Sequence, residues 1–316
     1  MKENDRLGKY RIIGVLGQGG EGCVYLAKDE SLSRFAALKR LWEGRDGRGS
    51  GSSGENGNGG DGASSEENRK DERQLWQEAA FLRDLRHPAL PVVYELFYEE
   101  GWYLAMEYIA GTSLHKYIRE GGPVSEEQAR LWARVLLDVL DYLHTRETPV
   151  IYRDFRPDNI MVCGDGSVRL VDFGAAAFHS FGEDGETRMA YTAGFAAPEQ
   201  RRENGRQAWA DERSDIYSFG KTLCYMVTGV EPEAAACAAL PPSCYNPLLS
   251  GELERIIARC TAQEPEERYQ VVSEIVRDME GAGRRRRGGR KREFVRHVEK
   301  QVCLAAAGSG RIFRGG

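Results

Sequence analysis

The sequence predicts an α+β fold of two lobes, a small β-rich lobe followed by a larger helical one. Strand-like runs prevail in residues 10–42 and 92–108, whereas helical spacing prevails after residue 112. The chain has 316 residues, 41% of them hydrophobic, which is enough to bury a sizeable core. We expect a cleft between the lobes, a common place for ligands.

The first lobe is predicted to hold a five-stranded antiparallel sheet and one helix. Runs of residues with high strand propensity, separated by glycine-rich or polar connections, predict strands at residues 10–16, 23–28, 35–41, 92–98 and 102–108. The helix is predicted over residues 71–86, where Leu75, Ala79, Leu82 and Leu85 form an apolar stripe.

Residues 44–68 interrupt this lobe with a glycine- and serine-rich segment. Nine of its residues are Gly and five are Ser, so it buries too little apolar surface to order itself. Closing a loop of about 25 residues costs only ~1.2 kcal/mol more than closing one of about six. An interdomain linker has a similar composition, but a single helix follows and makes no second core. We expect a disordered insertion within one lobe.

The second lobe begins with a helix-start signal. Ser125 followed by Gln128 is typical of a capping box, and it predicts a helix that runs to about His144. Further helical spacing occurs over residues 216–226 and 253–260.

Charge and cysteine content exclude several classes of protein. The 44 Lys and Arg against 49 Asp and Glu give a net charge of −5, so no nucleic-acid partner is expected. No apolar run approaches the roughly 20 residues of a membrane span, and the first residues do not resemble an export signal. The seven cysteines are scattered without a C-x-x-C pair, which disfavours zinc and disulfides. We expect a cytoplasmic protein with reduced thiols.

A glycine-rich motif joins the first two predicted strands. Gly17, Gly19, Gly22 and Val24 form a G-x-G-x-x-G-x-V pattern, in which glycines let the backbone approach phosphate oxygens. A ligand-free glycine hairpin has the same pattern. A dinucleotide-binding fingerprint is disfavoured because a strand, rather than a helix, follows the loop.

Two charged residues are predicted to face the interior of the first lobe. Lys39 shares a strand face with Ala37, directed toward whatever the glycine loop covers. Glu78 lies at the edge of the predicted helix's apolar stripe, where an unpaired carboxylate is costly to desolvate. Together they predict an ion pair between Lys39 and Glu78.

Two polar strings in the second lobe contain a candidate base and candidate metal ligands. Residues 151–160 read IYRDFRPDNI and residues 171–174 read VDFG. Asp154 is a candidate base, and Asn159 and Asp172 are oxygen ligands of the kind that suits Mg²⁺. Either string alone could be a polar turn, but the two together are hard to reach by chance.

These motifs resemble those of the eukaryotic-type (Hanks-type) protein kinases, specifically the bacterial serine/threonine kinases, over roughly residues 8–280. The resemblance implies a protein-kinase fold with an N-lobe over residues 8–107 and a C-lobe over residues 112–280. It also implies ATP and Mg²⁺ as cofactors, transfer of the γ-phosphoryl group to Ser or Thr of protein substrates, and autophosphorylation.

At the phosphate end, the resemblance gives each motif residue a role. Gly17, Gly19 and Gly22 would cover the phosphates, and Lys39 would hold the α- and β-phosphates while pairing with Glu78. The residues that would act on the transferred group are Asp154 as base, Arg156 as a neutralising cation, and Asn159 and Asp172 as magnesium ligands.

At the adenine end, the resemblance implies contacts from both lobes. Val24, Ala37 and Met161 would enclose the base beside Leu16. Met106 would be the gatekeeper residue, and the backbone of Glu107 and Ile109 would form the hinge contacts.

Further matches have scaffold roles by resemblance. Glu199 ends the activation segment and has Arg268 as its partner, while Asp215 braces the catalytic loop. Because small-molecule phosphotransferases of similar design would be expected to lack this segment, it favours protein substrates.

Two positions depart from the family pattern, and one threonine is a candidate modification site. Tyr152 stands in place of the usual histidine, and Arg156 in place of a lysine, which keeps the charge but changes its geometry. Arg153 could pair with a phosphate in the activation segment, and Thr187 is the autophosphorylation hypothesis.

The C-terminal tail, residues 281–316, is strongly basic. Residues 284–297 contain eight Lys or Arg and one Glu. A solvated tail is one interpretation. An anionic membrane surface, at about 1 kcal/mol per basic residue, or an acidic partner is another. Membrane association is expected if the natural chain continues beyond this tail.

A nucleotide-binding pseudokinase scaffold is the alternative function. It is disfavoured because Lys39, Asp154 and Asp172 are all present. A kinase for a small molecule such as an aminoglycoside or choline is disfavoured further.

Overall fold

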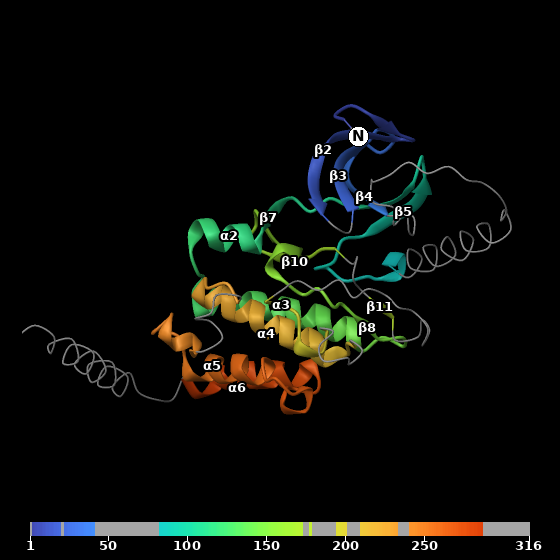
Figure 1. The fold of residues 1–316 in the computed structure, drawn as a ribbon. Coiled ribbons are helices and arrows are strands. Elements are labelled where there is room, and N and C mark those ends of the chain that lie inside the picture. The colour runs from blue at the N-terminus through green and yellow to red at the C-terminus, as the bar shows by residue number, and fades with distance from the viewer. Residues whose placement is uncertain are drawn as a thin grey trace, which may run out of the picture.

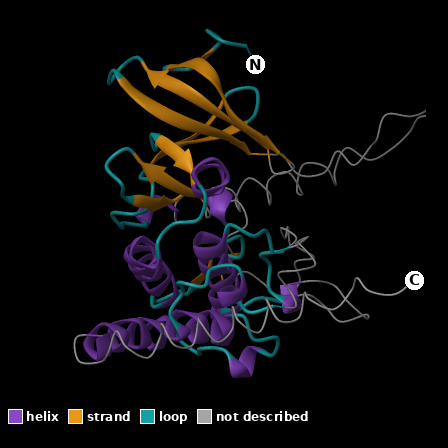
Figure 2. Ribbon diagram, turned by 90° about the vertical axis from the view of Figure 1, so that its left-hand side faces the viewer, coloured by secondary structure: helices purple, strands orange, loops and turns teal. Residues whose placement is uncertain are grey.

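The computed structural model describes residues 2–19, 22–41, 82–172, 177–178, 194–200, 209–232 and 240–286. These residues form a lobe built around a β-sheet and a second lobe built mainly of helices (Figures 1 and 2). The predicted α+β, two-lobe fold is confirmed. The predicted insertion at 44–68 and the tail beyond residue 286 lie outside the described residues.

The N-lobe contains one antiparallel sheet with strand order β1-β2-β3-β4-β6-β5. Its strands are β1 Arg6–Leu7, β2 Tyr10–Gly19, β3 Gly22–Asp29, β4 Arg34–Leu41, β5 Val93–Tyr98 and β6 Trp102–Glu107. The five predicted strands are present. The predicted total of five strands is wrong, because the sheet has a sixth strand, β1, at its edge. This strand has two residues and is too short to show an alternating pattern.

The predicted helix over residues 71–86 is described only from Leu82 onward. Residues 82–84 are helical, and Leu82 and Leu85 are buried, as the apolar stripe requires. Glu78 lies outside the described residues.

The C-lobe follows a short connection after Glu107. Its longer elements are α2 Leu114–Gly121, α3 Glu126–His144, α4 Glu212–Thr228, α5 Gly251–Cys260 and α6 Val272–Arg286. Its short strands are β7 Gly111–Ser113, β8 Val150–Ile151, β9 Ile160–Cys163, β10 Val168–Leu170 and β11 Ala177–Phe178. Helix α3 begins as predicted, because the Ser125 side chain accepts a hydrogen bond from the Gln128 backbone N–H.

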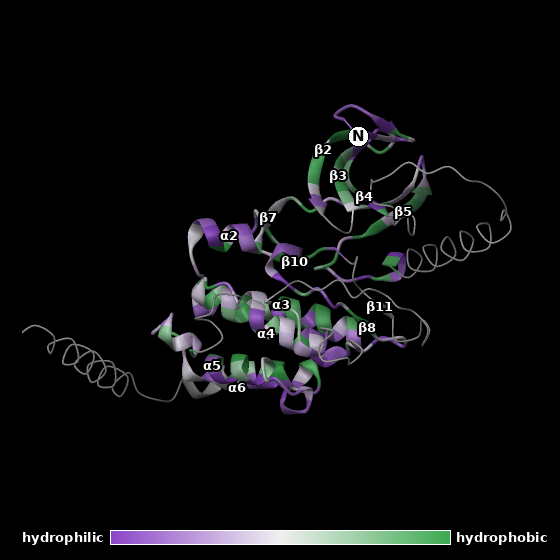
Figure 3. Ribbon diagram, in the orientation of Figure 1, coloured by the Kyte–Doolittle hydropathy of each residue, from purple (hydrophilic) through white to green (hydrophobic). Residues whose placement is uncertain are grey.

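Helix α4 passes through the centre of the C-lobe. Most of its residues are buried, which is typical of a helix surrounded by other elements rather than one lying on a surface. Asp211 and Ser214 form a capping box at its start, and Gly229, with φ of 69°, ends it in the left-handed conformation. Figure 3 shows hydrophobic residues along the C-lobe helices, where they meet in the core.

Helices α4 and α5 approach closely at Gly220. A Cβ atom at this position would lie 2.5 Å from the Cβ of Cys260 and 2.8 Å from the Cγ2 of Thr261. We expect Gly220→Ala to lower the free energy of unfolding by about 1–2 kcal/mol, since overpacking outweighs the helix propensity that alanine adds. Urea denaturation monitored by circular dichroism measures the difference.

Gly251→Ala is the matched control for this substitution. A Cβ atom at Gly251, in the first turn of α5, would meet no atom within 4 Å, so this variant should be as stable as the wild type or slightly more stable. Equal stability of the two variants would contradict the close approach of α4 and α5.

Candidate active site

A lysine of the N-lobe and an aspartate of the C-lobe meet at the junction of the lobes. The Nζ of Lys39, on β4, lies 2.5 Å from the Oδ1 of Asp172, although 133 residues separate them in sequence. The Lys39 side chain is 8% exposed. The two charges predicted to act on one ligand therefore lie together. The Lys39–Glu78 pair cannot be placed, because Glu78 is outside the described residues.

The sheet register places Lys39 on a face shared with other predicted site residues. Lys39 is opposite Val24 of β3, and Ala37 is opposite Met106 of β6. Directly opposite residues share a face of an antiparallel sheet, as do residues two apart on one strand. Val24, Ala37, Lys39 and Met106 therefore form one continuous surface.

The glycine motif forms the end of the β2–β3 hairpin. Gly17 pairs with Val24 and Gly19 with Gly22, and Gly22 has a φ of 134°, which favours glycine. Leu16 is 45% exposed. The hairpin thus ends beside the strand that carries Lys39.

The loop between β8 and β9 holds the candidate base. Asn159 Nδ2 donates to the Oδ2 of Asp154 at 2.8 Å and to its carbonyl oxygen at 2.9 Å, which closes the loop on itself. Arg156 Nε lies 3.8 Å from Asp154 Oδ2. Asp154, Arg156 and Asn159 therefore lie together, with the Asp154 carboxylate still 20% exposed.

Asp215 of α4, which is buried, contacts the backbone of this loop. Its carboxylate accepts the backbone N–H groups of Tyr152 and Arg153, each at 2.8 Å, and lies 2.9 Å from His144 Nε2. The bracing contact predicted for Asp215 is confirmed. The contact of His144 with Asp215 was not predicted, because His144 ends a helix 71 residues earlier in the chain and belongs to no local motif.

Tyr152 connects the base-bearing loop to the strand before Asp172. Its hydroxyl donates to the Val171 carbonyl oxygen at 2.5 Å. Burial, and then the charges of Asp172 and Asp154, raise the pKa of the Tyr152 hydroxyl well above its usual value, so it remains a donor at neutral pH. The aromatic residue at this departure from the family pattern is fully buried and hydrogen-bonded.

Two residues of the site have strained backbones. Arg153 and Asp172 both have a φ of 67°, which is uncommon for residues other than glycine. Contacts from Asp215 and Lys39 hold them in place. Burial also lowers the pKa of the Arg153 guanidinium from its ordinary value. Such strain is typical of functional positions.

The oxygen donors of the site suit Mg²⁺. Asn159 uses its amide nitrogen for Asp154, so its amide oxygen is the remaining polar atom of the side chain. Asp172 adds a carboxylate. Mg²⁺ in proteins is commonly bound by one or two such groups together with water and substrate phosphates. Among the described residues, no group of three or more His, Cys, Asp or Glu side chains forms a closed metal cage.

The connection between the lobes contains the predicted hinge residues. Ile109 is buried, and the Glu107 backbone N–H donates to the Val92 carbonyl oxygen at 2.8 Å. The Glu107 carboxylate forms a two-pronged ion pair with Arg169, a residue that the sequence analysis missed. Met161, on β9, lies directly opposite Arg169 of β10.

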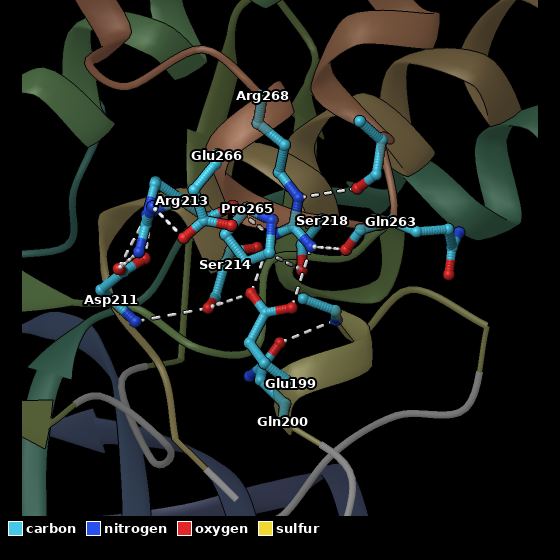
Figure 4. A network of polar contacts seen from close by, with 12 residues as sticks. Glu199, Gln200, Asp211, Arg213, Ser214, Ser218, Gln263, Pro265, Glu266 and Arg268 are labelled. Atoms are coloured by element: carbon cyan, nitrogen blue, oxygen red, sulfur yellow. Dashed lines mark hydrogen bonds and ion pairs between the residues drawn. The ribbon is translucent and has the colours of Figure 1, made fainter.

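The predicted partner of Glu199 is confirmed. Arg268 donates to both carboxylate oxygens of Glu199, at 2.7 and 2.9 Å, in a buried network (Figure 4). Phe173, Gly174 and Thr187 lie outside the described residues.

Comparison with known proteins decides the family. Residues 62–278, more than half of the chain, match the family model for the protein kinase domain. The chain belongs to the protein kinase family. The match begins after the glycine motif and Lys39, so the roles assigned to those residues depend on their motifs and geometry.

Individual kinases are similar over most of the chain. The serine/threonine-protein kinase PrkC of Bacillus subtilis is 29% identical over 308 residues, covering 93% of this chain and 44% of PrkC. PknB of Mycobacterium tuberculosis is 28% identical over 293 residues, covering 86% of this chain and 42% of PknB. The chain spans less than half the length of these relatives.

A solved kinase structure has the same fold. The kinase domain of PknI from Mycobacterium tuberculosis superposes with a TM-score of 0.62 at 21% identity, covering 89% of this chain and 99% of that one. The protein-kinase fold predicted from the motifs is confirmed.

Proposed function

We propose that this protein kinase transfers the γ-phosphoryl group of ATP to Ser or Thr hydroxyls of protein substrates and autophosphorylates. The observation that carries the proposal is the contact between Lys39 and Asp172 across the two lobes, beside the loop of Asp154 and Asn159. The kinase domain proposed from the motifs spans residues 8–280.

In this proposal, the residues act mainly by positioning and by charge. Lys39 binds the phosphates that the glycine motif covers, and Asp154 orients the substrate hydroxyl and accepts its proton. Arg156, 28% exposed beside Asp154, stabilises the negative charge of the transferring group. Asn159 and Asp172 hold Mg²⁺, which neutralises phosphate charge when bound.

Ser and Thr specificity and the choice of partners are also part of the proposal. A cation two residues after Asp154 supports Ser/Thr specificity, and the similar PrkC and PknB carry serine/threonine-protein kinase in their names. The tail over residues 281–316 supports binding to an acidic partner or an anionic membrane. Among the described helices, none combines the length and apolar character that crossing a bilayer requires.

Phosphate transfer from labelled ATP tests the proposed function. Purified protein with Mg²⁺ and a generic protein substrate should place label on Ser and Thr, and chelation of the metal with EDTA should reduce transfer to background, because two oxygen ligands and the phosphates need the cation. Excess Mg²⁺ should restore it.

The other outcomes of this assay contradict the proposal in different ways. Nucleotide binding without transfer would indicate a pseudokinase scaffold. Label found only on Tyr would contradict the Ser/Thr assignment, and label on a small molecule but no protein would contradict the substrate class.

A further inference from the structure

An ion pair joins Glu107, in the predicted hinge, to Arg169 of β10 in the C-lobe. Arg169 Nη1 lies 2.7 Å from Glu107 Oε1, and Arg169 Nη2 lies 3.0 Å from Glu107 Oε2. Two parallel N–H···O bonds of this kind fix orientation as well as distance. The side chains are 22% and 29% exposed, so solvent screens the pair only in part.

The strand pattern shows where the Arg169 side chain points. In β10, Val168 and Leu170 are buried in the C-lobe core, whereas Arg169 between them is partly exposed and faces away from that core. Arg169 is directly opposite Met161 in the β9–β10 pair, so the two side chains share a face. By resemblance, Met161 would contact the adenine. Arg169 therefore lies beside Met161 and contacts the hinge residue Glu107.

The ion pair is part of a set of contacts with residues 89–92. Arg169 Nη2 also donates to the Leu90 carbonyl oxygen at 3.0 Å, and the Val92 backbone N–H donates to Glu107 Oε2 at 3.2 Å. The Leu170 backbone N–H donates to the Ala89 carbonyl oxygen at 2.8 Å. The hinge and the residue 89–92 loop are thus joined to each other and to β10, which follows much later in the sequence, by the Arg169 and Glu107 side chains and the Leu170 backbone.

This arrangement couples the hinge peptide to the strand that leads to Asp172. Asp172 is three residues after Arg169, and its carboxylate contacts Lys39. A ligand could contact the hinge at one end and Lys39 and Asp172 at the other. The contacts of Arg169 would then fix the position of the hinge relative to Asp172. Ion pairs that solvent can reach usually contribute little to stability, so we expect this partly exposed pair to act in positioning rather than in folding.

We propose that Arg169 is a positioning residue for the nucleotide: by holding the Glu107 carboxylate it fixes the hinge peptide in the orientation that reads adenine. The inference depends on the proposed ATP-dependent function. Adenine presents an amino donor where guanine presents a carbonyl acceptor, so a fixed hinge peptide that matches one base opposes the other. A hinge that shifts accepts ATP less well and discriminates against GTP less strictly.

The test measures nucleotide use by Arg169→Met, in which a chain of similar length lacks the guanidinium. We expect the KM for ATP to rise about tenfold with kcat changed less than about threefold, because the defect lies in ground-state positioning. The preference for ATP over GTP in kcat/KM should fall by a similar factor. Arg169→Lys keeps the charge but lacks the forked guanidinium, so its KM and its ATP preference should lie between those of the wild type and those of Arg169→Met.

A charge swap separates positioning from simple loss of packing. Glu107→Gln alone should resemble Arg169→Met. The double variant Glu107→Arg with Arg169→Glu should bind ADP more tightly than Glu107→Arg or Arg169→Glu alone, because it restores an ion pair at the same place. Binding is measured by calorimetry, which requires no turnover.

Arg134→Met is the control, since Arg134 forms an exposed ion pair with Glu280 of α6, and α6 lies on the side of the C-lobe away from the N-lobe sheet (Figure 1). It should leave KM and selectivity unchanged. If Arg169→Met keeps the wild-type KM and ATP preference, or if the charge swap binds ADP no better than its single variants, the inference is wrong. If the wild type binds ADP but transfers no phosphate, the proposed function fails, while the calorimetric comparison still tests Arg169.

Discussion

The Asp154→Asn variant is expected to transfer phosphate about 10²–10⁴-fold more slowly than the wild type, the usual contribution of a positioned general base. Asparagine has nearly the same shape, and its side-chain oxygen can still accept the Asn159 Nδ2 hydrogen bond, now 2.8 Å long. The loop should therefore stay folded, and the KM for ATP should change little. Single-turnover transfer of labelled phosphate measures the rate.

Asp165→Asn is the matched control for this variant. Asp165 lies in the exposed turn between β9 and β10, where its carboxylate accepts hydrogen bonds from Ser167. The same chemical change at this position should leave the transfer rate unchanged. A rate for Asp154→Asn above about a tenth of the wild-type value would show that Asp154 is not the general base.

The strands could be predicted because runs of residues with high strand propensity are separated by glycine-rich or polar connections. Four of the five predicted strands both begin and end within one residue of their observed bounds. The β2 strand runs three residues beyond the predicted end at 16, to Gly19, because the backbone of the glycine motif pairs with β3 and needs no apolar side chain. The β1 strand, Arg6–Leu7, is fixed by pairing with β2 rather than by any pattern of its own.

The residues of the candidate site could be predicted where they belong to a local sequence motif. Asp154 and Asn159 stand five residues apart, and their contact follows from a single loop. The Arg169–Glu107 pair joins residues 62 positions apart. An arginine between apolar residues of a strand does not indicate in the sequence which residue it will contact. Sequence spacing predicts which groups are candidates for the chemistry, whereas the groups that contact them depend on how the lobes pack.

Arg268→Met is expected to lower the free energy of unfolding by about 3–5 kcal/mol, the usual cost of removing one partner of a buried ion pair. Arg268 is 1% exposed and uses all five of its N–H donors (Figure 4). Two bonds go to Glu199, and the other three go to the carbonyl oxygens of Ala262, Arg213 and Gln263. Urea denaturation measures the loss, and Arg134→Met, at an exposed pair, should cost about 0–1 kcal/mol.

The double variant Arg268→Met with Glu199→Gln shows how much of this loss comes from the charge left behind. In the single variant the buried Glu199 carboxylate keeps the Ser214 hydroxyl, at 2.7 Å, but loses its cation. Neutralising that carboxylate removes the uncompensated charge, so the double variant should be more stable than Arg268→Met alone, by about 1–2 kcal/mol. Three backbone carbonyls remain without their donor in both variants, which prevents full recovery. A double variant as unstable as the single one would place the whole effect in those carbonyls, and the Glu199 ion pair would then contribute no net stability to the C-lobe.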